Sequence, residues 1–200
     1  MDLRKRKTRA AIRAAFLELI AEKNVARITV TELSERAAIN KSTFYLHYRD
    51  LLDLLEELEE ELILQIVGAM GSVDCMFQDA DRFFRRFAKN LLDRQALLLL
   101  LYHNGRTPSL QSKLVSAFRQ QILEENPHVP FNEEMIIVLT FFLRGMMDVT
   151  LYEEFQDPQA VIEALTHTIC TITDHYRSLL VAQHLLPKSK APLKNSGVPF

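Results

Sequence analysis

The sequence is poor in the residues that mark several common classes of protein. Its 200 residues include no Trp, only two Cys and only five Gly. No run alternates clearly between apolar and polar residues, and no Asn-Gly or Asp-Gly pair joins two such runs, so β-hairpins are not expected. An apolar content of 48% is nevertheless enough for a hydrophobic core. We therefore expect an all-α protein.

The two cysteines, Cys75 and Cys170, are isolated and lack the spacing of a metal site or a redox pair. Both have apolar neighbours, which predicts buried thiols in a reducing cytosol. The apolar run at residues 96–102 is far too short to cross a membrane. The N-terminus is charged and has no apolar run with a cleavage site, unlike a signal peptide. We expect a cytoplasmic protein without a membrane partner.

Motifs of the common enzyme classes are also missing. The sequence has no Gly-rich phosphate loop, no His-Glu-x-x-His zinc helix and no nucleophile elbow. His167 and His175 are eight residues apart, which is not the spacing of a pair of metal ligands. We therefore expect no catalytic residues, no metal site and no cofactor.

Charge is distributed unevenly along the chain. Residues 1–49 hold eleven Lys and Arg against five Asp and Glu, whereas residues 50–200 hold thirteen against twenty-one. A basic segment on an acidic body favours contact with nucleic acid through one end. The chain opens on a basic arm, within which a helix is expected to begin and run to about residue 23. The arm consists of Arg4, Lys5, Arg6, Lys7 and Arg9.

We expect the basic arm to contact DNA phosphates, along the backbone or in a minor groove. The alternative is a disordered tail that only increases solubility.

Residues 29–55 contain the most informative pattern. Thr29 is a suitable N-cap, and Glu32 three residues later completes a capping box. An apolar stripe with helical spacing follows. Asn40 can then cap a second helix over residues 41–49. Two helices separated by about three residues have the spacing of a helix-turn-helix.

The second of these helices has an unusual outer face. Phe44 and Tyr48 are four residues apart and can both face the core. The remaining side chains carry hydrogen-bond donors and no negative charge: Lys41, Ser42, Thr43, Tyr45 and His47. DNA phosphates and base edges are bound by such groups. A helix face that is merely solvated would normally include Asp or Glu, so we expect this face to read DNA.

Residues 40–49 read Asn-Lys-Ser-Thr-Phe-Tyr-Leu-His-Tyr-Arg. They resemble the recognition helix of the tetracycline-repressor (TetR) family of bacterial regulators, which usually reads close to Ser-Lys-Gly-Thr-Phe-Tyr-x-His-Phe, then Lys or Arg. The resemblance covers roughly residues 5–55. Ser42 stands where the family commonly has Gly, and Leu51 where it commonly has a Lys that binds phosphate. We expect Arg49 to replace that Lys.

The resemblance implies a dimeric transcriptional regulator, a repressor that responds to an effector and binds a double-stranded DNA operator. Two recognition helices would enter successive major grooves about 34 Å apart. The effector could be a small apolar molecule. The alternative is an interaction module of the same fold, whose activity is set by a protein partner. The expected DNA-binding residues are Thr29, Thr31, Asn40, Lys41, Ser42, Thr43, Tyr45, His47 and Arg49.

We expect an N-terminal three-helix helix-turn-helix domain (residues 1–50), a C-terminal helical ligand-binding and dimerisation domain (51–186) and a flexible tail (187–200). The acidic run Glu56, Glu57, Glu59, Glu60 and Glu61 is expected to be a solvated helix face rather than a metal site. Further helices are expected over residues 51–70, 79–93, 94–102, 107–125 and 132–155, and from residue 159 onward.

The last two helices resemble the pair that this family docks against its twin, which implies a four-helix dimer interface. The body could also hold an effector cavity, because flexible Met and aromatic side chains suit apolar ligands. The same residues suit an ordinary core, so no ligand-binding residue is singled out. The candidates are Met135, Phe141, Phe142, Met146, Met147 and Tyr152, with Phe83, Phe87 and Tyr102 opposite.

Overall fold

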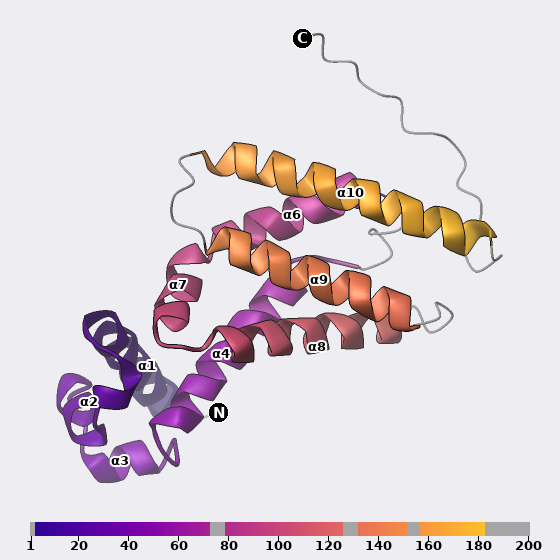
Figure 1. The fold of residues 1–200 in the computed structure, drawn as a ribbon. Coiled ribbons are helices and arrows are strands. Elements are labelled where there is room, and N and C mark those ends of the chain that lie inside the picture. The colour runs from indigo at the N-terminus through magenta and orange to yellow at the C-terminus, as the bar shows by residue number, and fades with distance from the viewer. Residues whose placement is uncertain (1–2, 73–78, 126–131, 152–156, 183–200) are drawn as a thin grey trace.

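The computed structural model describes residues 3–72, 79–125, 132–151 and 157–182, and every regular element in these ranges is a helix. The all-α class is therefore confirmed. Figure 1 shows a head formed by α1, α2 and α3, which the long helix α4 joins to a body formed by α6 to α10. None of the described helices is long and apolar enough to cross a membrane.

The head contains α1 (Leu3–Glu22), the short 3-10 helix η1 (Val25–Arg27), α2 (Val30–Arg36) and α3 (Lys41–Tyr45). The four-residue steps of α1 place Ile12, Phe16 and Ile20 on one buried face, as their spacing predicts. The basic residues near the N-terminus lie in the first turns of α1, so the alternative of a disordered tail is wrong.

The predicted capping box forms only in part. Thr29 Oγ1 accepts a hydrogen bond from Glu32 N at 3.2 Å, which is the expected N-cap. The Glu32 carboxylate does not reach back to Thr29 but accepts from Lys23 Nζ at 2.5 and 2.6 Å. Lys23 follows directly on α1 and offers a charged donor, which binds a carboxylate more strongly than a backbone N–H does.

Helix α3 is shorter than predicted. It ends at Tyr45 rather than Arg49, and the Asn40 side chain makes no cap hydrogen bond. His47 N and Tyr48 N still donate to Phe44 O at 2.9 and 3.0 Å, and the chain is extended by Asp50, with φ −159° and ψ −176°. Asp50 Oδ1 then accepts from Asp53 N at 2.8 Å and caps α4, as the sequence predicts.

Helix α4 (Leu51–Gly68) buries Leu55, Leu58 and Leu62 along one face. The expectation that its acidic run is a solvated face is wrong for Glu59, which has no exposed surface. Three donors on the α7–α8 turn and on α8 surround this carboxylate. Ser109 Oγ and Lys113 Nζ lie 2.7 and 2.9 Å from Glu59 Oε2, and Arg106 Nε bonds Oε1.

The body contains α6 (Ala80–Leu92), α7 (Gln95–His103), α8 (Thr107–Glu125), α9 (Glu133–Thr150) and α10 (Pro158–Ala182). Helix α10 packs against α6, and helix α8 packs against both α4 and α9. Asp79, Asn132 and Asp157 cap α6, α9 and α10, because each side chain accepts from a backbone N–H group of the first turn. Helix α9 ends at Thr150 rather than at residue 155.

Several candidate cavity residues belong instead to the packed core. Met135, Met147, Phe83 and Phe87 are at most 4% exposed. Tyr102 is 44% exposed and lies at the end of α7. Cys170 is only partly buried, contrary to the expectation for both thiols. Outside the described residues lie Cys75, His128, Tyr152 and the tail.

Candidate nucleic-acid interface

The turn between α2 and α3 is tight. Ile39 N donates to Ser34 O at 2.9 Å, and Ala38 N donates to Glu35 O at 3.1 Å. This pattern is a Schellman motif, which requires a left-handed residue after the helix. Ala38 takes that place with φ +53°, where glycine would be more usual. The turn therefore fixes the angle at which α3 leaves α2.

The side of α3 away from the core carries most of the predicted DNA-reading residues. Lys41, Ser42 and Tyr45 are exposed, while Thr43 and His47 are partly buried. Tyr45 is 58% exposed, and its ring stands edge-on to Phe44 at 5.4 Å between centroids. The structure thus leaves all five at least partly exposed on a segment, residues 41–49, that itself contains no Asp or Glu, although Glu35 of α2 lines the neighbouring cleft.

The opposite side of α3 is anchored in the head. Phe44 and Tyr48 are both buried, as their spacing predicts. The Tyr48 hydroxyl donates to Glu57 Oε1 at 3.1 Å and accepts from Arg9 Nε at 3.1 Å. Burial raises the pKa of Tyr48, which stays protonated. Arg9 also pairs with the Glu57 carboxylate. Arg9 is therefore a link between α1 and α4 rather than part of a DNA-contacting arm.

The basic start of α1 lies beside α3. A cleft of about 400 Å³ is lined by Arg4 and Thr8 from α1 and by Asn40 and Thr43 from the α3 end of the turn. Lys5, Arg6 and Lys7 follow Arg4 and are exposed. The structure thus brings Arg4 beside Asn40 and Thr43, although they are more than thirty positions apart in the sequence.

The three remaining predicted residues are all exposed. Thr29 is exposed but uses its hydroxyl oxygen to cap α2. Thr31 is exposed in the first turn of α2. The Arg49 side chain is 81% exposed, and its Nη2 lies 3.0 Å from Asp53 Oδ1. Hydrogen bonds from Arg49 lower the pKa of Asp53 below its usual value. Arg49 is close to α3 but already has an acidic partner.

Sequence reasoning missed Leu46, which is 83% exposed between Tyr45 and His47. The Leu46 side chain has no hydrogen-bonding group, whereas the prediction of this face rests on hydrogen-bond donors. Its exposure follows from the burial of Phe44 and Tyr48, because a residue midway between them on a helical turn points outward. An apolar side chain on such a surface can contact the methyl group of a thymine.

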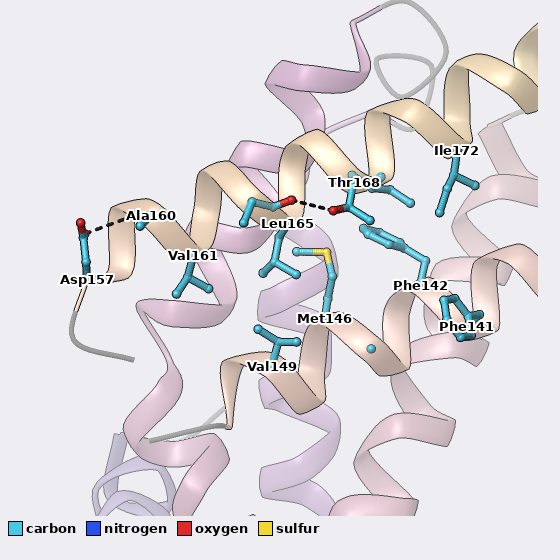
Figure 2. A pocket seen from close by; sticks show the side chains of 13 residues that line it. Phe141, Phe142, Met146, Val149, Asp157, Ala160, Val161, Leu165, Thr168 and Ile172 are labelled. Atoms are coloured by element: carbon cyan, nitrogen blue, oxygen red, sulfur yellow. Dashed lines mark hydrogen bonds between the residues drawn. The ribbon is translucent and has the colours of Figure 1, made fainter. Parts of the chain in front are cut away.

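The body carries a second candidate site, an apolar groove of about 580 Å³ between α9 and α10. Figure 2 shows Phe142 and Met146 of α9 facing Leu165 of α10. Phe142 packs edge-on against Phe84 at 4.7 Å between centroids, whereas Phe141 is 77% exposed at the rim. Three of the predicted cavity residues therefore line the groove: Phe141, Phe142 and Met146.

Polar groups at the groove are engaged locally. Thr168 Oγ1 donates to Ala164 O at 2.9 Å, and Asp157 Oδ1 accepts from Ala160 N at 3.2 Å (Figure 2). Among the described residues, no group of His, Cys, Asp and Glu has the arrangement of a metal site. The groove can therefore offer mainly apolar contact.

Comparison with known proteins gives a family match for most of the head and the first turns of α4. Residues 12–58 match the family described as bacterial regulatory proteins, tetR family. A curated relative from Bacillus subtilis (strain 168), an uncharacterized HTH-type transcriptional regulator named YxbF, is 34% identical over 68 residues. That match spans 34% of this chain and only 18% of the relative.

Two solved structures are similar over most of the chain at low sequence identity. The dihydroxyacetone kinase operon activator DhaS is 15% identical, with a TM-score of 0.46, over 88% of this chain and 95% of its own. The TetR family repressor AlkX from Dietzia sp. is 14% identical, with a TM-score of 0.46, over 82% of this chain and 97% of its own. The segment that matches the tetR family of bacterial regulatory proteins, residues 12–58, therefore contains the helix-turn-helix and the start of α4.

Proposed function

We propose that the chain is a sequence-specific DNA-binding transcriptional regulator, which acts as a homodimer and as an effector-responsive repressor. The observation that carries this proposal is the acid-free outer face of α3, with the basic first turns of α1 beside it. Donors and positive charge on one exposed surface suit a DNA groove and its phosphates. We assign DNA binding to residues 1–50 and regulation and dimerisation to residues 51–186.

We divide the contacts by the position of each side chain on α3. Lys41, Ser42 and Thr43 occupy its first turn, which in a helix-turn-helix is the part that reaches base edges. Tyr45 and His47 follow and would donate to phosphates. Arg49 would join them by exchanging Asp53 for a phosphate, since its side chain is 81% exposed. Thr29, Thr31 and Asn40 would contact the backbone at the edge of the site.

The proposed dimer uses the outer surface of α9 and α10. Phe141 and Ile137 are 77% and 67% exposed on α9, which is unusual for large apolar side chains. The neighbouring groove is lined partly by the small residues Gly145 and Ala164. In a two-fold dimer each surface faces its own copy, so the Phe141 ring of one protomer could enter the groove of the other. A two-fold operator would then be read by two heads.

The proposed effector is a small apolar molecule bound at the inner wall of the groove. Met146 and Ile169 line that wall and are at most 2% exposed. A flexible Met side chain can adapt to an apolar ligand. The alternative is a protein partner that sets the activity through the exposed rim. Co-purification from native extract separates the two, because a bound small molecule supports the effector and a stoichiometric protein supports the alternative.

Two substitutions test the DNA-binding face. Tyr45→Ala should weaken binding to all DNA sequences about equally, by about tenfold or more, because a hydrogen bond to a charged phosphate is lost. Thr43→Val should instead change the preference among operator variants at one base position, by roughly 1 kcal/mol or more. Fluorescence anisotropy with a set of labelled operator variants measures both effects.

Matched controls use the same residue types away from the face. Tyr102→Ala removes a half-exposed tyrosine on α7, and Thr171→Val removes an exposed hydroxyl on α10. Both controls should retain wild-type affinity and preference. The assignment of the face is wrong if Tyr45→Ala and Thr43→Val behave like these controls.

A further inference from the structure

Helix α3 is too short to hold its own position. It has five residues, and an isolated helix of that length is unstable in water. Figure 1 shows α3 between α2 and the first turns of α4. The turn from α2 fixes its N-terminal side, through the hydrogen bond from Ile39 N to Ser34 O. Its C-terminal side, which leads into α4, must be fixed by other contacts.

Tyr48 supplies these contacts with both its ring and its hydroxyl group. Tyr48 is 3% exposed, its amide donates to Phe44 O at 3.0 Å, and the two rings are 5.7 Å apart between centroids. The hydroxyl donates to Glu57 Oε1 of α4 and accepts from Arg9 Nε of α1, at 3.1 Å in both cases. The Arg9 guanidinium also lies over the Tyr48 ring, with its Cζ 5.7 Å from the centroid. One side chain thus attaches the end of α3 to two other helices.

The two partners of the hydroxyl belong to a ladder of ion pairs between α1 and α4. Arg9 and Arg13 are one helical turn apart on α1, as are Glu57 and Glu61 on α4. Arg9 pairs with Glu57, and Arg13 pairs with Glu61, while Arg13 Nη1 also lies 3.6 Å from Glu57 Oε1. Hydrogen bonds to charged groups are roughly twice as strong as those between neutral groups. The Tyr48 hydroxyl is therefore bound to a braced pair of charges rather than to a mobile side chain.

We propose that the Tyr48 hydroxyl is a positioning group for base recognition, because it fixes the orientation of α3 in the groove. The tetracycline-repressor pattern usually has Phe at this position, which would fill the same space without a polar contact. Hydrogen bonds to base edges need a donor and an acceptor within about 2.7–3.2 Å, so a small shift of α3 breaks them. A long, flexible Lys side chain can follow a phosphate through the same shift.

The hydroxyl should therefore matter for the preference among DNA sequences more than for general affinity. This consequence rests on the proposed function, whereas the attachment of α3 to α1 and α4 does not.

The attachment can be tested without DNA. The amides of His47 and Tyr48 both donate to Phe44 O, so their exchange with solvent reports release of the C-terminal side of α3. Tyr48→Phe removes one hydroxyl and keeps the ring, and we expect it to accelerate both exchange rates about tenfold. The Ile39 amide, on the N-terminal side of α3, should keep its rate. Tyr102→Phe removes the hydroxyl of a half-exposed tyrosine on α7 and is the matched control, which should change none of the three rates.

The effect on DNA binding is measured with operator and scrambled DNA in parallel. Tyr48→Phe should weaken binding to the operator about tenfold and leave binding to scrambled DNA unchanged, because no phosphate contact is removed. The dependence of affinity on salt should also stay as in the wild-type protein. Arg9→Lys keeps the charge but lacks the second donor with which Arg9 bonds Tyr48 and Glu57 together, so it should lower the preference for the operator in the same direction.

Three results would overturn the proposal: unchanged exchange at His47 and Tyr48 in Tyr48→Phe, equal acceleration at Ile39, or equal losses of affinity for operator and scrambled DNA. Equal acceleration at Ile39 would mean that the hydroxyl only stabilises the head as a whole. A wild-type protein that shows no preference for any operator would refute the proposed function instead. The exchange rates would still decide whether the hydroxyl holds the end of α3.

Discussion

Glu59 belongs to an acidic run in the sequence, but its side chain is buried in the folded protein. Burial alone would raise the pKa of its carboxyl, but hydrogen bonds from Arg106, Lys113 and Ser109 outweigh burial and hold that pKa below its usual value. The side chains of Arg106 and Lys113 are 23% and 27% exposed, so both keep some contact with water. Glu59 therefore joins α4 to α8 only while it is ionised.

The lowered pKa makes the contribution of Glu59 to stability depend on pH. The contribution is complete above the pKa of the unfolded carboxyl, about 4.3, and is lost as the pH falls through the lower pKa of the folded state. Glu59→Gln should therefore lower the free energy of unfolding by about 3 kcal/mol at pH 7. Urea unfolding at pH 7 and at pH 3 should show this difference shrinking under acid conditions.

The control for this experiment is Glu60→Gln, since the neighbouring carboxyl is exposed and lies 4.0 Å from Lys113 Nζ. Its effect should be small at both pH values. An equal loss of stability in Glu59→Gln at pH 3 and pH 7 would show that shape, rather than charge, explains the role of Glu59.

At the scale of the helices, start signals were predictable because a cap acts within one turn. Asp50, Asp79, Asn132 and Asp157 each cap a helix that begins within about one residue of its expected start, whereas Asn40 makes no cap hydrogen bond. The end of α3 was not predictable in the same way. Just beyond this end, Tyr48 bonds Glu57 and Arg9, partners 9 and 39 positions away. Propensity and spacing carry no information about such distant contacts.

The proposed pairing of α9 and α10 with a second copy gives a prediction at this scale. Phe141→Ser should weaken dimerisation by about thirtyfold, because a buried aromatic anchor at an interface often contributes about 2 kcal/mol or more. The folded protomer should keep its stability, since Phe141 is 77% exposed. Analytical ultracentrifugation over a concentration series measures the dissociation constant.

Leu123→Ser is the matched control for the dimer, because Leu123 is 41% exposed on α8. It should not change the association. If Phe141→Ser associates as the wild-type protein does, the surface around the groove is not the dimer interface.

At the scale of the whole molecule, the sequence predicted the basic head, the acidic body and the outward donor side chains of α3, whose DNA-binding role stays a prediction. It did not predict which charged side chains would form ion pairs within the protein. Arg9 was expected at DNA but binds Glu57, and Glu59 was expected in solvent but is buried. Residue type and local spacing identify donors, but only the packing of α1 on α4 decides which donors remain on the surface. Division into three segments at residues 50 and 186 stays a prediction.

The central claim is that the acid-free face of α3 and the basic start of α1 bind a specific DNA sequence. The most direct measurement is binding of the purified wild-type protein to the DNA upstream of its own gene, against scrambled DNA, at several salt concentrations. We predict binding by a dimer with about a thousandfold or greater preference for its operator, and an affinity that falls steeply with salt. No binding even at low salt would contradict the claim.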